Sequence, residues 1–246
     1  MLVVGGVSKW FSVGGECVIA LNDVSFEVGC GEIVKVVGGS LDGKTTLLKV
    51  AAGLERPDEG SVRLWDRELT TLSEKQRSGV LGMDILWLSR SGPALPLDVA
   101  DWVGWPWARS GKRRAVERRA AQMLERVGMR EYARRTWAEL SHGQRVLAAF
   151  ARAFVGSPRL VVIDDLLGGL DARIGEEAID LLRELMRESG RGCGVLFSVS
   201  EGDSTGLVDR VLTIYEGSVA SMTGLAENDA DILPFPAEKR QKDAGR

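Results

Sequence analysis

The stretch VVGGSLDGKTTLLKV, residues 36–50, limits the fold of this chain more than any other part of the sequence. It continues an apolar, β-rich run, and the helix-forming sequence that follows ends at a further glycine. The loop has the spacing Gly38-x-x-x-x-Gly43-Lys44-Thr45. Backbone N–H groups at a helix start attract phosphate, the lysine adds positive charge, and the hydroxyl can bind Mg²⁺. This order of strand, glycine loop and helix predicts a P-loop that binds a nucleotide.

Two residues inside this loop, Leu41 and Asp42, are unusual for a phosphate-binding site. They put a bulky side chain and a negative charge where phosphate groups would pass closely. Leucine at position 41 also disfavours a positive φ angle, which glycine adopts easily, because leucine has a Cβ atom. The sequence therefore raises two questions, whether this loop still holds a nucleotide and whether the chain hydrolyses it.

The rest of the chain alternates between strand and helix patterns. Continuous apolar runs at residues 159–165 and 194–200 are typical of buried parallel strands. Residues 210–224 predict a hairpin that turns at Glu216 and Gly217. Strands that alternate with helices indicate an α/β domain around a mostly parallel core sheet.

Helices are predicted both between these strands and before them. Asp171 can cap a helix that Gly190 ends, and residues 112–127 have the periodicity of an amphipathic helix. Several prolines predict that residues 87–111 are irregular, and about 85–140 reads as a helical insertion. The buried stripe expected on the helix after Asp171 is Ile174, Ala178, Leu181, Leu182 and Leu185.

Composition narrows the class of protein. The net charge of −3 over 246 residues gives no indication of a nucleic-acid partner, so none is expected. No run of roughly 18 apolar residues occurs, so we expect no direct insertion into a membrane. The three cysteines are scattered without metal-ligand spacing, as in proteins with reduced thiols. The polar residues 225–246 predict a loosely held, flexible C-terminal tail.

A second candidate feature is the run LVVIDD, in which a buried strand ends in Asp164 and Asp165. A carboxylate at this position can hold Mg²⁺, and the next residue can act as a base for an attacking water. Many strands end in acids, so this pair is weak evidence alone. Its place on another parallel strand after the P-loop makes Asp164 a candidate metal ligand.

A third candidate is LSHGQ, which comes just before an alanine-rich helix. Ser141 and Gly143 would present a hydroxyl and backbone N–H groups at the positive end of that helix. His142 is the sole histidine of the chain. We interpret it as a helix-start residue, since the sequence offers no further ligands for a metal site.

Taken in order, these motifs resemble the nucleotide-binding subunits of ABC transporters. The order is GGSLDGKTT, LSHGQ, LVVIDD, GGLD and LFSVS, and the resemblance extends from about residue 2 to residue 224. LSHGQ is similar to the family signature LSGGQ. Residues 106–129 look most like the lipoprotein-release and macrolide-export branch. The resemblance implies an ABC-type P-loop NTPase at 1–224, with an N-terminal antiparallel β subdomain and a helical subdomain at about 85–140.

The resemblance also implies a mechanism and a set of partners. Two such subunits would pair head to tail, and each ATP with its Mg²⁺ would lie between one P-loop and the other chain's signature. Closure of the pair would drive transmembrane permease subunits, whose coupling segment would dock near residues 87–110. The chain would then lie at the cytoplasmic face of the cell membrane, held there by the permease.

The family's site residues can be assigned to positions in this chain that match its motifs. Phe11 would stack on adenine, and Thr45 and Asp164 would bind the metal. The nucleotide-binding set is Phe11, Gly38, Gly39, Ser40, Asp42, Gly43, Lys44, Thr45, Thr46, Ser141, Gly143 and Gln144.

Departures from the family pattern fall in the catalytic parts. Asp165 stands where the family has a catalytic glutamate, and Ser200 stands where it has a switch histidine. The family's glutamine that senses the γ-phosphate is missing, and Arg90 or Ser91 occupies its place. A shorter carboxylate and a serine are poor substitutes for a positioned base and an imidazole.

The losses affect groups that would act on ATP in this chain's own loop. The groups that would bind this ATP are mostly retained, and so is the signature. This favours an asymmetric pair, in which this chain holds ATP in an impaired site and serves an intact, different partner. Two alternatives remain. One is a homodimeric transporter ATPase with slow activity, and the other is a soluble ABC-type regulatory or scaffold protein that takes no part in transport.

Overall fold

The computed structural model describes residues 1–93, 96–108, 113–200 and 207–224. The tail predicted at 225–246 lies outside the described residues. Two sheets organise the described chain. The first is antiparallel with the order β2-β1-β4-β5, and its strands are β1 (Leu2–Val13), β2 (Glu16–Val28), β4 (Glu59–Leu64) and β5 (Arg67–Glu68).

The second sheet has the order β10-β9-β3-β8-β7-β6 and carries the candidate site. Five of its strands are parallel, and β10 pairs antiparallel with β9 at one edge. The strands are β3 (Ile33–Val37), β6 (Ile85–Ser89), β7 (Leu160–Asp164), β8 (Gly194–Ser198), β9 (Arg210–Tyr215) and β10 (Ser218–Gly224). The hairpin predicted to turn at Glu216 and Gly217 is confirmed.

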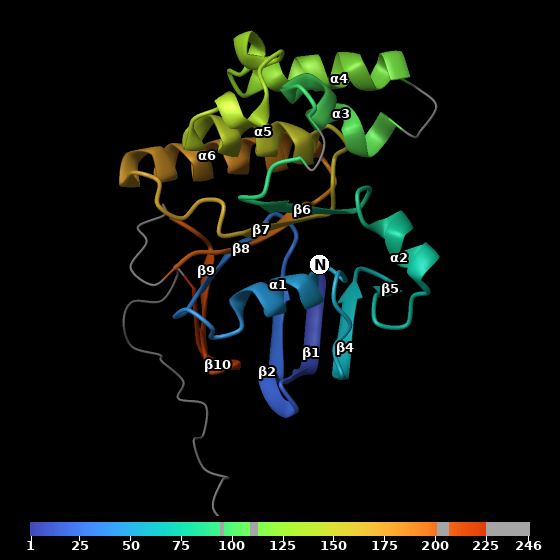
Figure 1. Cartoon of the computed structure of the whole chain (residues 1–246), viewed down its shortest axis with the longest axis vertical. Coiled ribbons are helices and arrows are strands. Elements are labelled where there is room, and N and C mark those ends of the chain that lie inside the picture. Colours follow the sequence, from blue (N-terminus) through green and yellow to red (C-terminus); the bar gives the residue numbers. More distant parts are fainter. Residues whose placement is uncertain (94–95, 109–112, 201–206, 225–246) are drawn as a thin grey trace, which may run out of the picture.

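The helices lie on both sides of this second sheet. They are α1 (Lys44–Ala51), α2 (Glu74–Val80), α3 (Val99–Ala108), α4 (Arg113–Arg126), α5 (His142–Phe154) and α6 (Ala172–Ser189). Two 3-10 turns, Arg130–Tyr132 and Trp137–Glu139, lie between α4 and α5. Helices α3 to α6 lie on one side of the sheet, and α1 with the antiparallel sheet lies on the other (Figure 1).

The central strands are apolar throughout because both of their faces are covered. Neighbouring residues on a strand point to opposite faces. On β7, Val161 and Ile163 pack in the cluster under the helices, whereas Leu160 and Val162 pack in the cluster shared with α1 and the antiparallel sheet. Two hydrophobic clusters, one on each face, therefore hold the carboxyl ends of β3, β7 and β8 in place.

The predicted helix at 112–127 is confirmed as α4, and Asp171 caps α6 as expected, with its side chain accepting from the N–H of Arg173. The interpretation of 87–111 as irregular is wrong, because the end of β6 and all of α3 lie in this range, and α3 contains Pro106. None of the helices in the described ranges is both long and apolar enough to cross a membrane.

The proline in α3 is tolerated because another element replaces the bond that it removes. Pro106 has no N–H to donate to the carbonyl one turn earlier, which is that of Trp102. The guanidinium of Arg152 on α5 donates to that carbonyl instead, and it also lies 4.8 Å from the centroid of the Trp102 ring. Burial lowers the pKa of Arg152 to about 10.

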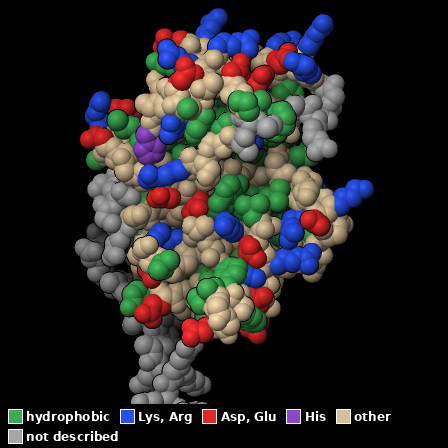
Figure 2. Space-filling model, viewed as in Figure 1, with side chains coloured by type: hydrophobic (Ala, Val, Ile, Leu, Met, Phe, Trp, Pro, Cys, Tyr) green, Lys and Arg blue, Asp and Glu red, His purple; other side chains and the backbone are tan. Residues whose placement is uncertain are grey.

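Charged side chains of both signs are interspersed over the helical end of the molecule (Figure 2). Several of them are paired on the surface, among them Arg126 on α4 with Glu184 and Glu188 on α6. These pairs raise the pKa of the Arg126 guanidinium. Exposed pairs of this kind contribute little to stability, about 0–1 kcal/mol each.

Candidate active site

The P-loop joins the end of β3 to the start of α1, and two of its glycines are required by close packing. A Cβ atom on Gly38 would lie 2.5 Å from the carbonyl oxygen of Ile214 on β9. Gly43 has a φ angle of 95°, and its Cβ would lie 2.4 Å from the carbonyl oxygen of Ala20 on β2. The loop is thus seated against backbone from both sheets, which fixes the direction of its N–H groups.

The side chain of Lys44 bonds back to the first residues of the P-loop. Its Nζ donates to the carbonyl oxygens of Gly38 at 2.7 Å and Gly39 at 2.6 Å. The positive charge therefore lies at the mouth of the loop, next to the start of α1. A cation at a helix N-terminus with free N–H groups makes an anion-binding site.

Neither of the two unusual loop residues fills this cradle. The Leu41 side chain is 100% exposed, at a positive φ angle of 75°, so it lies in solvent. The Asp42 carboxylate accepts from the N–H of Gly39 at 2.6 Å and from the N–H of Glu216 at 3.2 Å. Asp42 therefore ties the loop to the β9–β10 turn, and its carboxylate is directed to these two N–H groups.

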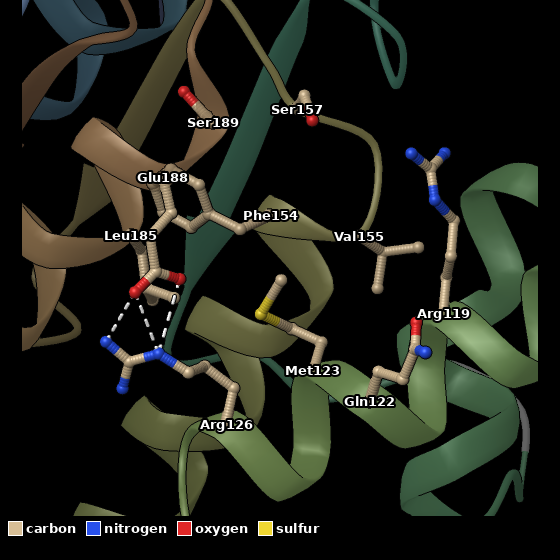
Figure 3. A pocket seen from close by; sticks show the side chains of 10 residues that line it. All are labelled: Arg119, Gln122, Met123, Arg126, Phe154, Val155, Ser157, Leu185, Glu188 and Ser189. Carbon is tan, nitrogen blue, oxygen red and sulfur yellow. Dashed lines mark hydrogen bonds and ion pairs between the residues drawn. The ribbon is translucent and has the colours of Figure 1, made fainter.

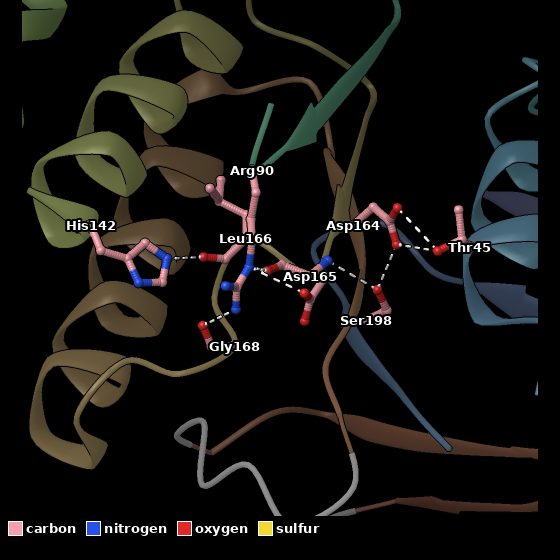
Figure 4. A network of polar contacts seen from close by, with 8 residues as sticks. All are labelled: Thr45, Arg90, His142, Asp164, Asp165, Leu166, Gly168 and Ser198. Carbon is pink, nitrogen blue, oxygen red and sulfur yellow. Dashed lines mark hydrogen bonds and ion pairs between the residues drawn. The ribbon is translucent and has the colours of Figure 1, made fainter. Parts of the chain in front are cut away.

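Thr45 and Asp164 come together as the metal prediction requires. The Thr45 Oγ1 lies 3.0 Å and 3.2 Å from the two carboxylate oxygens of Asp164 (Figure 4). A hydroxyl and a carboxylate are hard oxygen ligands that suit Mg²⁺, which usually binds one or two protein groups together with substrate phosphates. The donor set fits a nucleotide-bound Mg²⁺.

Ser198 is a site residue that sequence reasoning missed. Its Oγ donates to the Asp164 carboxylate at 3.0 Å and accepts from the N–H of Asp165 at 3.1 Å. Asp164 and Ser198 are register partners on β7 and β8, and Ser198 is only 1% exposed. A serine within the otherwise apolar strand at 194–198 was the available signal, since a buried hydroxyl needs a partner.

Asp165 lies at the start of the loop after β7 with its backbone at a φ angle of 51°. One of its carboxylate oxygens lies 3.1 Å from the Nε of Arg90, and the same Nε donates to its carbonyl oxygen at 2.6 Å. Arg90 directly follows β6, and its Nη2 also donates to the carbonyl of Gly168. Ser200 lies exposed just beyond the end of β8.

The signature segment begins α5. The Ser141 Oγ accepts from the N–H of Gln144 at 3.3 Å, and the Gln144 Oε1 accepts from the N–H of Ser141 at 2.9 Å, which forms a capping box. The Nε2 of His142 bonds to the carbonyl oxygen of Leu166 at 2.8 Å. A Cβ on Gly143 would meet nothing within 4 Å. His142 lies on the opposite side of Asp165 from Thr45, so the signature is not part of the P-loop site (Figure 4).

Phe11 lies on β1 with 37% of its surface exposed, and the Nζ of Lys9 lies 5.2 Å from its ring centroid. It is therefore an accessible aromatic side chain on the antiparallel sheet.

A separate cavity of about 310 Å³ lies between α4, α5 and α6 (Figure 3). Its lining includes Met123, Phe154 and Leu185 but none of the predicted nucleotide-binding residues.

Comparison with known proteins decides the family. The family model described as "ABC transporter" matches residues 21–167, which include the P-loop, the LSHGQ segment and Asp164. The chain belongs to the ABC transporter family. The Lipoprotein-releasing system ATP-binding protein LolD of Cereibacter sphaeroides is 33% identical to it over 89% of this chain and 98% of that protein.

A second relative of this ABC chain is the Macrolide export ATP-binding/permease protein MacB of Chlorobium luteolum, 31% identical over 87% of this chain. The chain spans 32% of the length of that relative. These two relatives confirm the predicted resemblance to the lipoprotein-release and macrolide-export branch.

Solved structures confirm the predicted ABC-type fold. The dimeric, post-hydrolysis structure of an ATP-binding cassette bound to ADP and Pi has a TM-score of 0.81 to this chain at 24% identity. The match covers 93% of this chain and 100% of that cassette. At this identity the likeness concerns the fold.

Proposed function

We propose that this chain is the ATP-binding subunit of an ABC transporter complex and that it binds Mg²⁺-ATP in its own P-loop. Phe11 would stack on adenine, and Lys44 would bind the phosphates together with N–H groups of the loop other than that of Gly39, which donates to Asp42. Thr45 and Asp164 would hold the metal ion, which neutralises phosphate charge. The contact of Thr45 with Asp164, at 3.0 Å, is the observation that carries this proposal.

We further propose that the chain's own site hydrolyses ATP slowly or not at all. A general base needs a carboxylate within reach of the attacking water. The Asp165 carboxylate is one methylene shorter than the family's glutamate, and one of its oxygens is paired with Arg90. Ser200 cannot supply the charge of an imidazole, which removes a second contribution to catalysis.

The signature of this chain is proposed to serve the ATP of a second, different ATPase subunit. Ser141 and the α5 N-terminus form a regular cap, so a hydroxyl and N–H groups are presented at a positive helix end. Names of the relatives LolD and MacB describe lipoprotein release and macrolide export. A permease partner and a place at the cytoplasmic face of the membrane follow for this chain as part of the proposal.

A homodimer is the second candidate, and the dimeric state of the solved ATP-binding cassettes favours it. In a homodimer both sites would contain Asp165 and Ser200, so both would be slow. The two candidates predict different subunits in a complex purified from membranes. They also predict different effects of signature variants on the ATPase rate of that complex.

The test is affinity purification of the tagged full chain from detergent-solubilised membranes, followed by ATPase assays. We expect a multi-span permease and a second ATPase subunit to accompany the chain. Ser141→Ala should lower the ATPase rate of the complex about tenfold or more, because one catalytic group is lost, whereas Asp165→Ala should leave most of the rate. Recovery with ribosomes or DNA and no permease would favour the soluble regulatory alternative instead.

A further inference from the structure

The end of β6 and the loop after β7 are joined by one side chain, that of Arg90. Ser89 and Asp164 are register partners on the two strands, so the residues that follow them lie side by side. The Arg90 guanidinium makes three contacts with one short segment: the carboxylate and the carbonyl of Asp165, and the carbonyl of Gly168. A planar group with donors in fixed directions is well suited to hold such a segment in one conformation.

The segment that Arg90 holds is constrained elsewhere too. Asp165 has a left-handed backbone, which a residue with a Cβ atom adopts only at an energetic cost. Its N–H donates to Ser198, and the next carbonyl, that of Leu166, bonds to His142. Contacts from Arg90, from Ser198 on β8 and from His142 on α5 therefore compensate the strained conformation, and those from Arg90 also determine where the Asp165 carboxylate lies.

The charge pair itself is easily reached by solvent. The side chains of Arg90 and Asp165 are 51% and 49% exposed, so water and salt screen their attraction and the pair contributes little to stability. The pair is thus poorly explained as a stabilising salt bridge. The pair instead determines the position of the Asp165 carboxylate, because one of its oxygens is held against Arg90.

We propose that Arg90 is a positioning residue that keeps position 165 from acting as a base on ATP in this chain's own site. It does so by holding residues 165–168 against the end of β6 and by pairing with the carboxylate there. This inference rests on the proposed function, because it concerns the same ATP site. It predicts that lengthening the carboxylate at position 165 is insufficient to restore hydrolysis while Arg90 is present.

The test is a double-mutant cycle in the full chain, in a Ser200→His background that supplies the imidazole of the family. The four proteins carry no further change, Arg90→Gln, Asp165→Glu, or both. Single-turnover hydrolysis of Mg²⁺-ATP is measured with the chain in excess, and nucleotide affinity is measured separately. Arg134→Gln is the matched control, since the Arg134 side chain is 86% exposed and pairs with Asp98 at 2.9 Å outside the site.

The expected result is coupling between the two positions. The double variant should hydrolyse ATP at least about tenfold faster than the product of the two single effects predicts, with nucleotide affinity changed by less than about threefold. Loss of a purely structural contact would lower the rate rather than raise it. Arg134→Gln combined with Asp165→Glu should show no coupling.

A second measurement does not depend on catalysis. Amide hydrogen exchange at Leu166, Leu167 and Gly169 should become faster in Arg90→Gln and remain unchanged in Arg134→Gln. Unchanged exchange, or single-variant effects on the hydrolysis rate that simply multiply in the double variant, would overturn the inference.

If wild-type chain fails to bind Mg²⁺-ATP, or the Lys44→Ala variant binds it equally well, the proposed function itself fails. The two failures are therefore distinguishable.

Discussion

The Oγ1 of Thr45 lies 3.0 Å from the carboxylate of Asp164, although 119 residues separate the two in the sequence. Thr45 is the second residue of α1 and Asp164 ends β7, and both elements pack in the hydrophobic cluster shared with the antiparallel sheet. The sheet order places β8 between β3 and β7, so the P-loop and the acidic strand end meet at one edge. The fold thus builds a site for a phosphate-bound metal ion from two distant motifs.

Ser198 is expected to control that metal site. Ser198→Ala removes a donor to Asp164 and an acceptor for the N–H of Asp165. The partly buried N–H of Asp165 would then lack this partner, so the unfolding free energy should fall by about 1 kcal/mol. Urea unfolding measures this loss, and a titration of Mg²⁺ against bound ATP should show weaker metal dependence. Ser189→Ala is the control, because the Ser189 hydroxyl donates to the carbonyl of Met186 in its own helix and lies outside the metal site. Equal behaviour of the two variants would contradict the role of Ser198.

Arg152 is expected to compensate for Pro106. Arg152→Met leaves the carbonyl of Trp102 without its donor, and the unfolding free energy should fall by about 1–3 kcal/mol. Pro106→Ala restores an N–H that can donate to that carbonyl, so the cost of Arg152→Met should be smaller in the Pro106→Ala background. Chemical unfolding of the four proteins of this cycle checks the coupling. Strictly additive effects would show that the two residues act independently.

The three cysteines should differ sharply in reactivity. Cys17 and Cys30 are exposed, whereas Cys193 is buried and burial raises the pKa of its thiol to about 12. A thiol-specific reagent at pH 8 should modify two cysteines quickly and the third only after unfolding. Fast modification of all three in folded protein would contradict the structure.

Cys193 also gives stability a pH dependence. The folded state keeps the thiol proton up to about pH 12, while an unfolded thiol ionises near 9.0. The unfolded state therefore loses its proton first, and this contribution is complete below pH 9 and lost as pH rises toward 12. Compared with Cys193→Ala, the wild-type chain should lose additional stability across this interval. Parallel stability curves for the two proteins would refute this.

Leu41 is expected to have little effect on nucleotide affinity, because its side chain is fully exposed. Leu41→Gly removes a side chain from the loop tip and suits the φ angle of 75°. The affinity for ATP should change by less than about threefold, which corresponds to about 0.6 kcal/mol. Isothermal titration calorimetry measures it. A gain of tenfold or more would mean that Leu41 obstructs the loop after all.

Local patterns predicted most of the elements and the position of the P-loop. The cap at Asp171, the hairpin turn at Glu216 and the strand end at Asp164 depend on a few neighbouring residues, which the sequence shows directly. The buried stripe of α6 is displaced from the expected one: Ile174 is 40% exposed, and Ile179 and Met186 are buried instead. Helical periodicity locates a face only to within about one residue, and the packing partner decides its centre.

The remaining features depend on contacts between distant elements. Helix α3 was missed because Arg152, from another helix, compensates for its proline. Ser198 was missed because its role follows from the register of β7 and β8. Pairing of Arg90 with Asp165 likewise requires β6 and β7 to be neighbours. The structure shows where each predicted site residue lies, and the roles of these residues in ATP chemistry stay predictions.

The most direct test of the central claim, that this chain binds ATP in its own site and scarcely hydrolyses it, uses the purified full chain. Radiolabelled ATP with Mg²⁺ is incubated with excess chain, and bound ATP and ADP are quantified over time, with Lys44→Ala and the exposed helix variant Lys49→Ala as controls. Wild type and Lys49→Ala are expected to retain ATP largely intact, and Lys44→Ala is expected to bind little. Rapid conversion to ADP that Lys44→Ala abolishes would contradict the central claim.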